Sequence, residues 1–298
     1  MTDIPRVSVI IPTYNRSAVL RHAITSVLAQ TFTDFELLVV GDCCTDDSAA
    51  VVAGFADPRI RWFNLPANSG HQSGPNNEGL RQAKGELIAY LGHDDLWLPH
   101  HLQVLVAAID GGADMVGGLT EMVAPEGRLL EIAPPQLNYR AGFWMPPSAL
   151  MHRRSLTVRI GGWRDYRELT IYPEADLIAR AVAGGARLEV VARLTAVKFP
   201  AGWRKNVYRI AGGSEQAAWL ARMAGDPEFE RHEMARLIYA GKNGQMRRER
   251  PYRQLWLDLA RETQSRIAAR LQSLRICLAG SGARIDSDRR YKGLDRRR

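Results

Sequence analysis

Apolar positions in the first hundred residues follow two alternating patterns. Short β-branched runs predict buried strands, and apolar spacings of three and four predict helices. Predicted strands cover residues 7–11, 35–40, 60–64 and 86–91, and predicted helices cover residues 17–30, 47–55 and 76–84, with another helix beginning at Pro99. Strands separated by helices are typical of an α/β fold with a doubly wound, mostly parallel sheet.

Acidic residues follow two of these strands. Asp42 comes after the second strand, and Asp94 and Asp95 come after the fourth. Ligands of such sheets bind beyond the carboxyl ends of the strands, so these side chains are expected near a site. Carboxylates there suit Mg²⁺ or Mn²⁺, and an aspartate can also accept a hydrogen bond from a base or a ribose hydroxyl.

The usual phosphate-binding motifs are absent from the sequence. There is no GxxxxGK[ST] pattern, and no GxGxxG follows the first strand. These absences exclude a P-loop enzyme and an ordinary dinucleotide dehydrogenase. A nucleotide held through a metal ion remains as the predicted ligand.

Composition is that of an ordinary globular protein of one large or two modest domains, with 298 residues and 46% hydrophobic positions. Two of the three cysteines, Cys43 and Cys44, are adjacent, and no CxxC pattern occurs, which argues against a disulfide framework or a zinc module. No signal peptide or membrane span is predicted. The expected location is cytoplasmic, with any membrane contact peripheral and at the inner face.

Positive charge is concentrated in the last fifth of the chain. Residues 1–240 hold 24 Lys and Arg against 26 Asp and Glu, whereas residues 241–298 hold 16 against 6. The overall net charge of +8 therefore belongs to the tail, and an anionic partner of the tail need not be the ligand of the body.

Helical patterns continue up to this basic region and into it. Residues 215–225 and 229–240 are predicted helices, and an apolar stripe flanked by arginines runs through residues 252–278. Three interpretations of the stripe remain open: packing on the body or on a second subunit in a homodimer, contact with an anionic membrane, or nucleic-acid binding, which is not expected because no known module is present. Residues 286–298 are charged and are predicted to be disordered.

Six segments, taken in order, resemble the family 2 glycosyltransferases over about residues 5–205. They are VSVIIPTYNR (7–16), ELLVVGDCCTDD (36–47), NSG (68–70) with GPNNEG (74–79), AKGELIAYLGHDDLWLP (83–99), PSALMHRR (147–154) with IGGW (160–163), and EADLIAR (174–180). The resemblance implies a GT-A fold and transfer of a sugar from a nucleotide-sugar, UDP-sugar favoured, to a saccharide or lipid-linked acceptor, with inversion. It implies a role in polysaccharide biosynthesis and Mn²⁺ or Mg²⁺ as cofactor.

The same resemblance assigns site residues. The nucleotide-binding set that it implies is Pro12, Thr13, Tyr14, Asn15, Asp42, Asn68, Gly70, Asn76 and His93. Asp94, with Asp95 beside it, matches the metal-binding carboxylate. Glu174 matches the general base, and Asp176 is the competing base.

Several positions depart from the family pattern. Gly41 and Gly92 stand where the family usually has aspartates, and Asn76 stands where an arginine often meets the phosphates. His93 either replaces a lost contact or caps its loop. Trp97 and Trp163 are candidates to stack on a sugar, although packing in the core is the commoner role of tryptophan.

The resulting prediction is a GT-A transferase domain over residues 1–205, a basic helical extension over residues 206–285 and a disordered tail over residues 286–298. Two alternatives stay open. One is a catalytically inactive homologue that acts as a binding or scaffold subunit, suggested by Gly41 and Gly92. The other is a nucleotidyltransferase-like enzyme, against which the Glu174 segment argues.

Overall fold

The computed structural model describes residues 4–125, 129–134, 136–140, 143–209, 212–242, 289 and 291–294. Its strands are β1 (Val7–Thr13), β2 (Phe35–Gly41), β3 (Ile60–Asn64), β4 (Leu87–Tyr90), β5 (Leu96–Trp97), β6 (Met115–Val123), β7 (Leu129–Ala133), β8 (Leu150–Arg153) and β9 (Leu188–Lys198). Its α-helices are α1 (Ser17–Leu28), α2 (Ser48–Ala53), α3 (Ser73–Gln82), α4 (His101–Asp110), α5 (Arg154–Ile160), α6 (Pro173–Ala183), α7 (Ser214–Gly225) and α8 (Phe229–Lys242).

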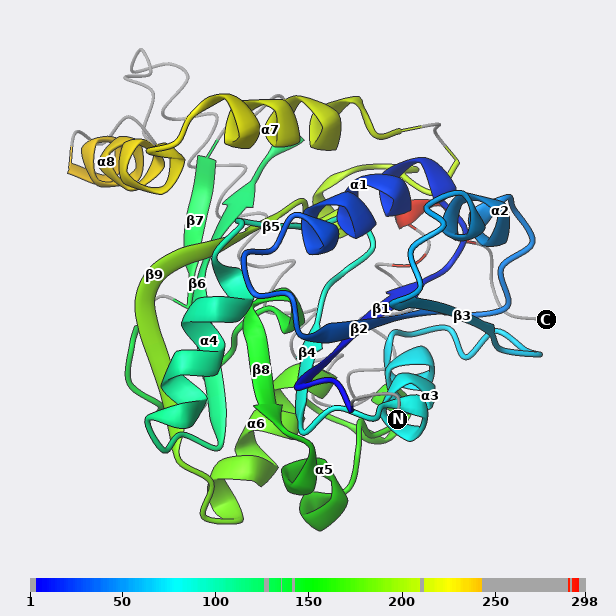
Figure 1. Cartoon of the computed structure of the whole chain (residues 1–298), viewed down its shortest axis with the longest axis horizontal. Coiled ribbons are helices and arrows are strands. Elements are labelled where there is room, and N and C mark those ends of the chain that lie inside the picture. The colour runs from blue at the N-terminus through cyan, green and yellow to red at the C-terminus, as the bar shows by residue number, and fades with distance from the viewer. Residues whose placement is uncertain are drawn as a thin grey trace, which may run out of the picture.

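The strands of the described part of the chain form one sheet in the order β3-β2-β1-β4-β8-β6-β9-β5, with β7 paired to β6 (Figure 1). The first four are parallel neighbours, and the sheet becomes mixed from β8 onward. The predicted doubly wound α/β architecture is therefore confirmed. Because β1, β2 and β4 run in the same direction, the segments that follow them meet at one edge of the sheet.

Alternate residues of the parallel strands face opposite layers of helices, as the two-residue period of a strand requires. Val9 and Leu37 belong to a core beneath α1 and α4, whereas Ile10 and Leu38 belong to a core that contains residues of α6. The parallel strands are buried on both faces, which explains why their sequences read as continuous apolar runs.

Two element boundaries differ from the prediction. Strand β1 continues through Pro12 to Thr13, because both residues pair with β2 in a parallel register. Helix α3 begins at Ser73, three residues before the predicted start at 76, so the Gly74-Pro75 step lies inside its first turn. Proline is well accommodated there because the first amide groups of a helix have no partner within it.

Helices α7 and α8 pack against the far part of the sheet and form a third core. Trp219 of α7 lies edge-on between Phe199 and Phe229. The predicted helix over 252–278 lies outside the described residues. Residues 289 and 291–294, in the segment predicted to be disordered, are held against the body by hydrogen bonds to residues 206–209. Among the described helices, none combines the length and the hydropathy needed to cross a bilayer.

Candidate active site

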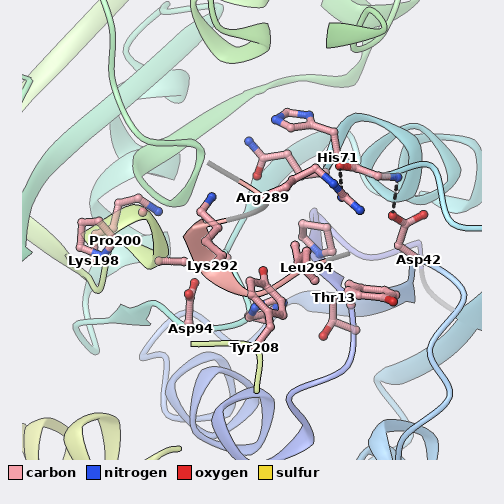
Figure 2. A pocket seen from close by; sticks show the side chains of 18 of the residues that line it. Thr13, Asp42, His71, Asp94, Lys198, Pro200, Tyr208, Arg289, Lys292 and Leu294 are labelled. Carbon is pink, nitrogen blue, oxygen red and sulfur yellow. Dashed lines mark hydrogen bonds between the residues drawn. The ribbon is translucent and has the colours of Figure 1, made fainter. Parts of the chain in front are cut away.

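A cavity of about 520 Å³ opens at the edge of the sheet beyond β1, β2 and β4. Its lining comes from the ends of β1 and β2, the loop before α3 with the first turn of that helix, residues 92–94, β6, residues 144, 172 and 174, the chain between 198 and 208, and residues 289, 292 and 294. Thr13, Asp42, Asp94 and Glu174 all line this cavity, so the fold brings together side chains that are up to 161 positions apart in the sequence (Figure 2).

Asp42 organises the loop before α3. Its two carboxylate oxygens accept hydrogen bonds from the backbone N–H groups of Ser69 (2.7 Å) and Gly70 (3.0 Å), and its backbone carbonyl accepts one from Asn68 (3.0 Å). Asn68 and Gly70, which were predicted to bind nucleotide, are thereby tied to Asp42. The positive φ of Gly70 allows its N–H to point at the carboxylate.

Asp94 lines the cavity and pairs with Arg16, whose Nη1 lies 3.1 Å from Oδ2. Burial disfavours its charged form, but the charge of His93 in its protonated form and the permanent charges of Arg16 and Lys198 outweigh burial and hold the pKa of Asp94 below its usual range. Gln216 of α7 donates a hydrogen bond to the Asp94 backbone carbonyl. Asp94 is therefore a buried carboxylate that stays ionised at the cavity wall.

Asp95 has a different environment. Its Oδ1 accepts a hydrogen bond from the Phe199 backbone N–H (3.0 Å), and its Oδ2 accepts hydrogen bonds from Ser148 Oγ and Lys198 Nζ. Asp95 is fully buried and is not among the residues that line the cavity. This geometry favours a structural role over the predicted metal contact, because Asp95 joins the β4 loop to the end of β9.

Within the described ranges, no three His, Cys, Asp or Glu side chains gather into a preassembled metal centre. Asp94 and the neighbouring His93 both line the cavity. Mg²⁺ and similar ions are commonly held by one or two carboxylates with substrate phosphates completing the shell. The residues present fit that mode, in which the ion and the diphosphate bind together.

His93 lines the cavity and lies edge-on to the ring of Tyr208, with centroids 6.0 Å apart. Burial lowers the pKa of His93 to about 4, against the opposing charge of Asp94. The imidazole is therefore neutral at neutral pH. Because the ring lines the cavity, its position favours contact with a ligand over a role limited to capping the loop.

Glu174 stands in the first turn of α6 and is buried at the cavity. Its Oε1 accepts a hydrogen bond of 2.7 Å from the indole N–H of Trp144, and its Oε2 has no hydrogen-bond partner among the described residues. Burial raises the pKa of Glu174, and the Trp144 hydrogen bond opposes that rise. A buried carboxylate with one free oxygen and a raised pKa has the properties of a general base.

Asp176, the competing base, is held by two arginines. Arg180 Nε lies 2.8 Å from its Oδ2, and Arg164 Nη1 lies 3.4 Å from its Oδ1. Arg180 also donates to the backbone carbonyls of residues 160–162. Asp176 is not among the lining residues, and these contacts favour a role in holding α6 in place.

The two tryptophans predicted to stack on sugar lie in the core. Trp97 is stacked on His101, and its indole N–H donates to the Ser148 carbonyl. Trp163 packs edge-on against Tyr90. Neither lines the cavity, so their burial does not support a sugar contact.

Other aromatic residues line the cavity. The sequence predicted Tyr14 to be part of the site, but it did not predict Trp144, Tyr172 or Tyr208. They come from loops without a periodic pattern. The sequence held one signal for these residues: Tyr172 directly precedes Pro173, which begins the helix of Glu174, so it had to lie near the predicted base.

Local packing explains the departures from the family pattern. A Cβ atom at Gly41 would lie 2.5 Å from Asn64 Oδ1 and 2.7 Å from the Trp62 ring, and one at Gly92 would lie 2.8 Å from Asp95 Oδ2. Neither position has room for an aspartate. At each position, the space that a side chain would occupy is taken by a neighbouring side chain.

Two other predicted nucleotide-binding residues lie behind the cavity wall. Asn76 is fully buried, and its side-chain amide has no partner in the described chain. Asn15 has a positive φ, and its Oδ1 accepts hydrogen bonds from the backbone of Thr45 and Asp46. Asn15 therefore joins the loops that follow β1 and β2.

The doubly wound sheet and the cavity at its carboxyl edge are the arrangement of an α/β enzyme domain. The sequence pattern of the family described as "Glycosyl transferase family 2" matches residues 8–161, more than half of the chain. The chain therefore belongs to glycosyl transferase family 2. Glu174, Lys198 and Tyr208 lie beyond the matched residues.

Several curated proteins share the first part of the chain. A GalNAc(5)-diNAcBac-PP-undecaprenol beta-1,3-glucosyltransferase of Campylobacter jejuni is 38% identical over 131 residues, which cover 42% of this chain and 41% of that protein. The UDP-Glc:alpha-D-GlcNAc-diphosphoundecaprenol beta-1,3-glucosyltransferase WfgD of Escherichia coli is 36% identical over 34% of this chain and 40% of its own. The chain thus spans about two fifths of these relatives.

Solved structures share the fold. The crystal structure of S. aureus TarS 1–349 in complex with UDP-GlcNAc is 25% identical, with a TM-score of 0.56, and the match covers 65% of this chain and 58% of that one. The matching share of this chain is consistent with the GT-A body that the sequence predicts.

Proposed function

We propose that this protein transfers a sugar from a nucleoside-diphosphate sugar to a hydroxyl group of a saccharide or lipid-linked acceptor, with inversion at the anomeric carbon. One observation carries the proposal: Asp42, Asp94 and Glu174, which stand on three separate elements, line one cavity at the carboxyl edge of a family 2 sheet. A nucleotide site and a buried base are thus within reach of one bound substrate.

The donor's nucleoside is assigned to the side of the cavity formed by Pro12, Thr13 and Tyr14 with the Asp42 loop. These residues offer backbone groups at the end of β1 and a carboxylate whose remaining lone pairs can accept from a ribose or a base. UDP is the preferred nucleotide in this proposal, because the name of WfgD specifies UDP-Glc and TarS has been crystallised with UDP-GlcNAc.

The diphosphate is assigned to the Asp94 side. Asp94, with His93 beside it, would hold Mn²⁺ or Mg²⁺ together with the donor phosphates, and the ion would supply Lewis-acid stabilisation of the departing diphosphate. Arg16 fixes the Asp94 carboxylate at the wall and keeps it ionised.

Glu174 is assigned as the general base. Its free Oε2 accepts the proton of the acceptor hydroxyl as the acceptor oxygen forms a bond to the anomeric carbon. The bond between that carbon and the diphosphate oxygen breaks in the same displacement, and the diphosphate leaves with the electron pair. Attack from the face opposite the leaving group inverts the anomeric centre. Lipid-linked acceptors are included because the names of both curated relatives specify undecaprenol-linked glycans.

The test is turnover of a panel of UDP-, GDP- and dTDP-sugars with Mn²⁺, with nucleoside diphosphate release as the readout. Glu174→Gln should lower kcat by about 10²–10⁴-fold, the usual contribution of a general base. Asp94→Asn should weaken Mn²⁺ binding in the presence of nucleoside diphosphate. Glu189→Gln, on the exposed far end of β9, is the matched control and should retain activity. Full activity of Glu174→Gln would refute the assignment of the base.

A further inference from the structure

A short piece of the basic tail returns to the cavity. Residues 289 and 291–294 are about 200 positions from the loop before α3, yet Arg289, Lys292 and Leu294 line the same cavity as Asp42 and Asp94 (Figure 2). We call residues 289 and 291–294 the return segment. Its position was not predicted from the sequence, which assigned residues 286–298 to a disordered tail.

Backbone hydrogen bonds hold the return segment on the chain after β9. Asn206 N–H donates to the Tyr291 carbonyl (2.9 Å), and Tyr208 N–H donates to the Lys292 carbonyl (3.1 Å). The Arg209 guanidinium donates to the Gly293 carbonyl (3.0 Å). These contacts run in register along residues 206–209, so the segment has one defined placement.

Gly293 makes this close approach possible. Its φ is +89°, and an added Cβ would lie 3.1 Å from Arg209 Cγ and 3.2 Å from Asn206 Cα. A side chain here would be strained by the backbone conformation and would press against the backbone of residue 206. The glycine therefore lets the return segment bring its two cations over the cavity.

Arg289 reaches the nucleotide side. Its Nη1 donates to the Gly70 carbonyl, and the Gly70 N–H donates to Asp42. The guanidinium is thus attached to the loop that Asp42 organises. Only one of its five N–H donors is used in that bond, and the group faces the cavity.

Lys292 reaches the opposite side. A Cβ added at Gly202 would lie 3.9 Å from Lys292 Cε, so the lysine stem passes along residue 202. Lys292 lines the cavity together with Asp94, the proposed metal-binding carboxylate, and Glu174, the proposed base. Figure 2 draws Lys292 between Lys198 and Tyr208.

We propose that Arg289 and Lys292 of the return segment bind the diphosphate of the donor, an inference that rests on the proposed function. Both side chains line the same cavity as the residues assigned to the nucleoside and to the metal ion. Arg16 and Lys198, which form ion pairs with Asp94 and Asp95, add further positive charge near this part of the cavity. Charge-assisted contacts from a guanidinium and an ammonium are the usual protein ligands of phosphate oxygens. The two side chains would donate hydrogen bonds to the phosphate oxygens, as the backbone N–H groups of a Gly-rich loop do in proteins that have that motif.

The experiment is calorimetric titration of the full chain with UDP, GDP and dTDP, and with the matching nucleosides. For whichever diphosphate binds, Arg289→Gln and Lys292→Gln should each raise Kd by about tenfold, the size expected for one charge-assisted hydrogen bond. The Kd of the nucleoside should not change, and Lys292→Arg should recover most of the affinity. Lys84→Gln, on an exposed lysine remote from the cavity, is the charge-matched control.

A second pair of variants tests the placement of the segment without removing a charge. Gly293→Ala should weaken diphosphate binding, whereas Gly225→Ala, at the end of α7 with no atom within 4 Å of an added Cβ, should not. Circular dichroism and thermal unfolding identify any variant that fails to fold.

The outcomes separate the two proposals. Unchanged diphosphate affinity in both charge variants overturns the inference and leaves the proposed function standing. Tighter binding in those variants also overturns it, because the segment would then obstruct the donor. Failure of the wild-type chain to bind any of the three nucleoside diphosphates overturns the proposed function and the inference together.

Discussion

The indole N–H of Trp144 donates a 2.7 Å hydrogen bond to Oε1 of Glu174, and Oε2 is buried without a partner in the described chain. This single bond stabilises the charged carboxylate, whose pKa burial raises. It also orients the free oxygen. Trp144 therefore positions the proposed base rather than reacting itself.

The variant Trp144→Phe removes the bond and keeps most of the aromatic bulk. The pKa of Glu174 should rise further, so the acidic limb of the kcat/KM profile should move to higher pH, and activity at neutral pH should fall by about three- to tenfold. A pH profile measured with the preferred donor checks this. An activity loss without movement of the acidic limb would indicate that Trp144 contributes packing alone.

Asp95 is expected to matter for stability more than for metal binding. Asp95→Asn leaves Lys198 without its buried counter-charge and should lower the free energy of unfolding by about 3 kcal/mol in urea denaturation. In the folded variant, the Mn²⁺ affinity measured with nucleoside diphosphate should stay near the wild-type value, unlike that of Asp94→Asn. Equal weakening of Mn²⁺ binding by both variants would make Asp95 a ligand after all.

Restoring the family aspartate at position 41 should not restore a missing function. Gly41→Asp forces a side chain against Asn64 and Trp62 and should destabilise the protein by about 2 kcal/mol, the usual size of an overpacking penalty. Donor affinity should not improve. Thermal unfolding together with UDP titration tests this, and tighter binding in a stable variant would contradict it.

A pH effect is expected away from the cavity. Glu121 of β6 is fully buried and bonded to Arg236 of α8, and burial, followed by the charge of Glu233, raises the pKa of Glu121 to about 8. Between its unfolded pKa of about 4.3 and about 8, the native state keeps a proton that the unfolded chain releases. The free energy of unfolding should therefore fall as pH rises through this range.

In Glu121→Gln this fall between pH 5 and pH 8 should be smaller, since the glutamine side chain does not titrate. Urea denaturation at several pH values measures it. Glu228→Gln, on an exposed glutamate of the same region, should reproduce the wild-type slope. If the free energy of unfolding of wild type and of Glu121→Gln changed with pH in parallel, Glu121 would be ruled out as the cause of the pH dependence.

Periodicity predicted the α/β body because its signals are local. The β-branched runs of β1 and β2 and the acidic residues after β2 and β4 are visible in a few consecutive positions. The roles of Asp95 and Asp176 were not visible in this way. Each depends on partners brought in by distant elements, Lys198 at the end of β9 in one case and Arg164 in the other.

The aromatic residues show the same limit. Trp97 and Trp163 stand beside sequence motifs and were candidates to stack on a sugar, but both side chains are buried in the core, the commoner role of tryptophan. Trp144 and Tyr208 carried no motif. Only the packing of the loops around the cavity reveals which aromatic side chains reach it.

The family match ends at residue 161, whereas Glu174, Lys198 and the return segment lie after it. The cavity therefore combines residues inside the family match, such as Asp42 and Asp94, with residues beyond it, such as Glu174, Lys198 and Arg289. A chimera joined near residue 161 would therefore keep Asp42 and Asp94 but exchange the proposed base and the return segment, so we expect it to change acceptor choice and donor affinity together.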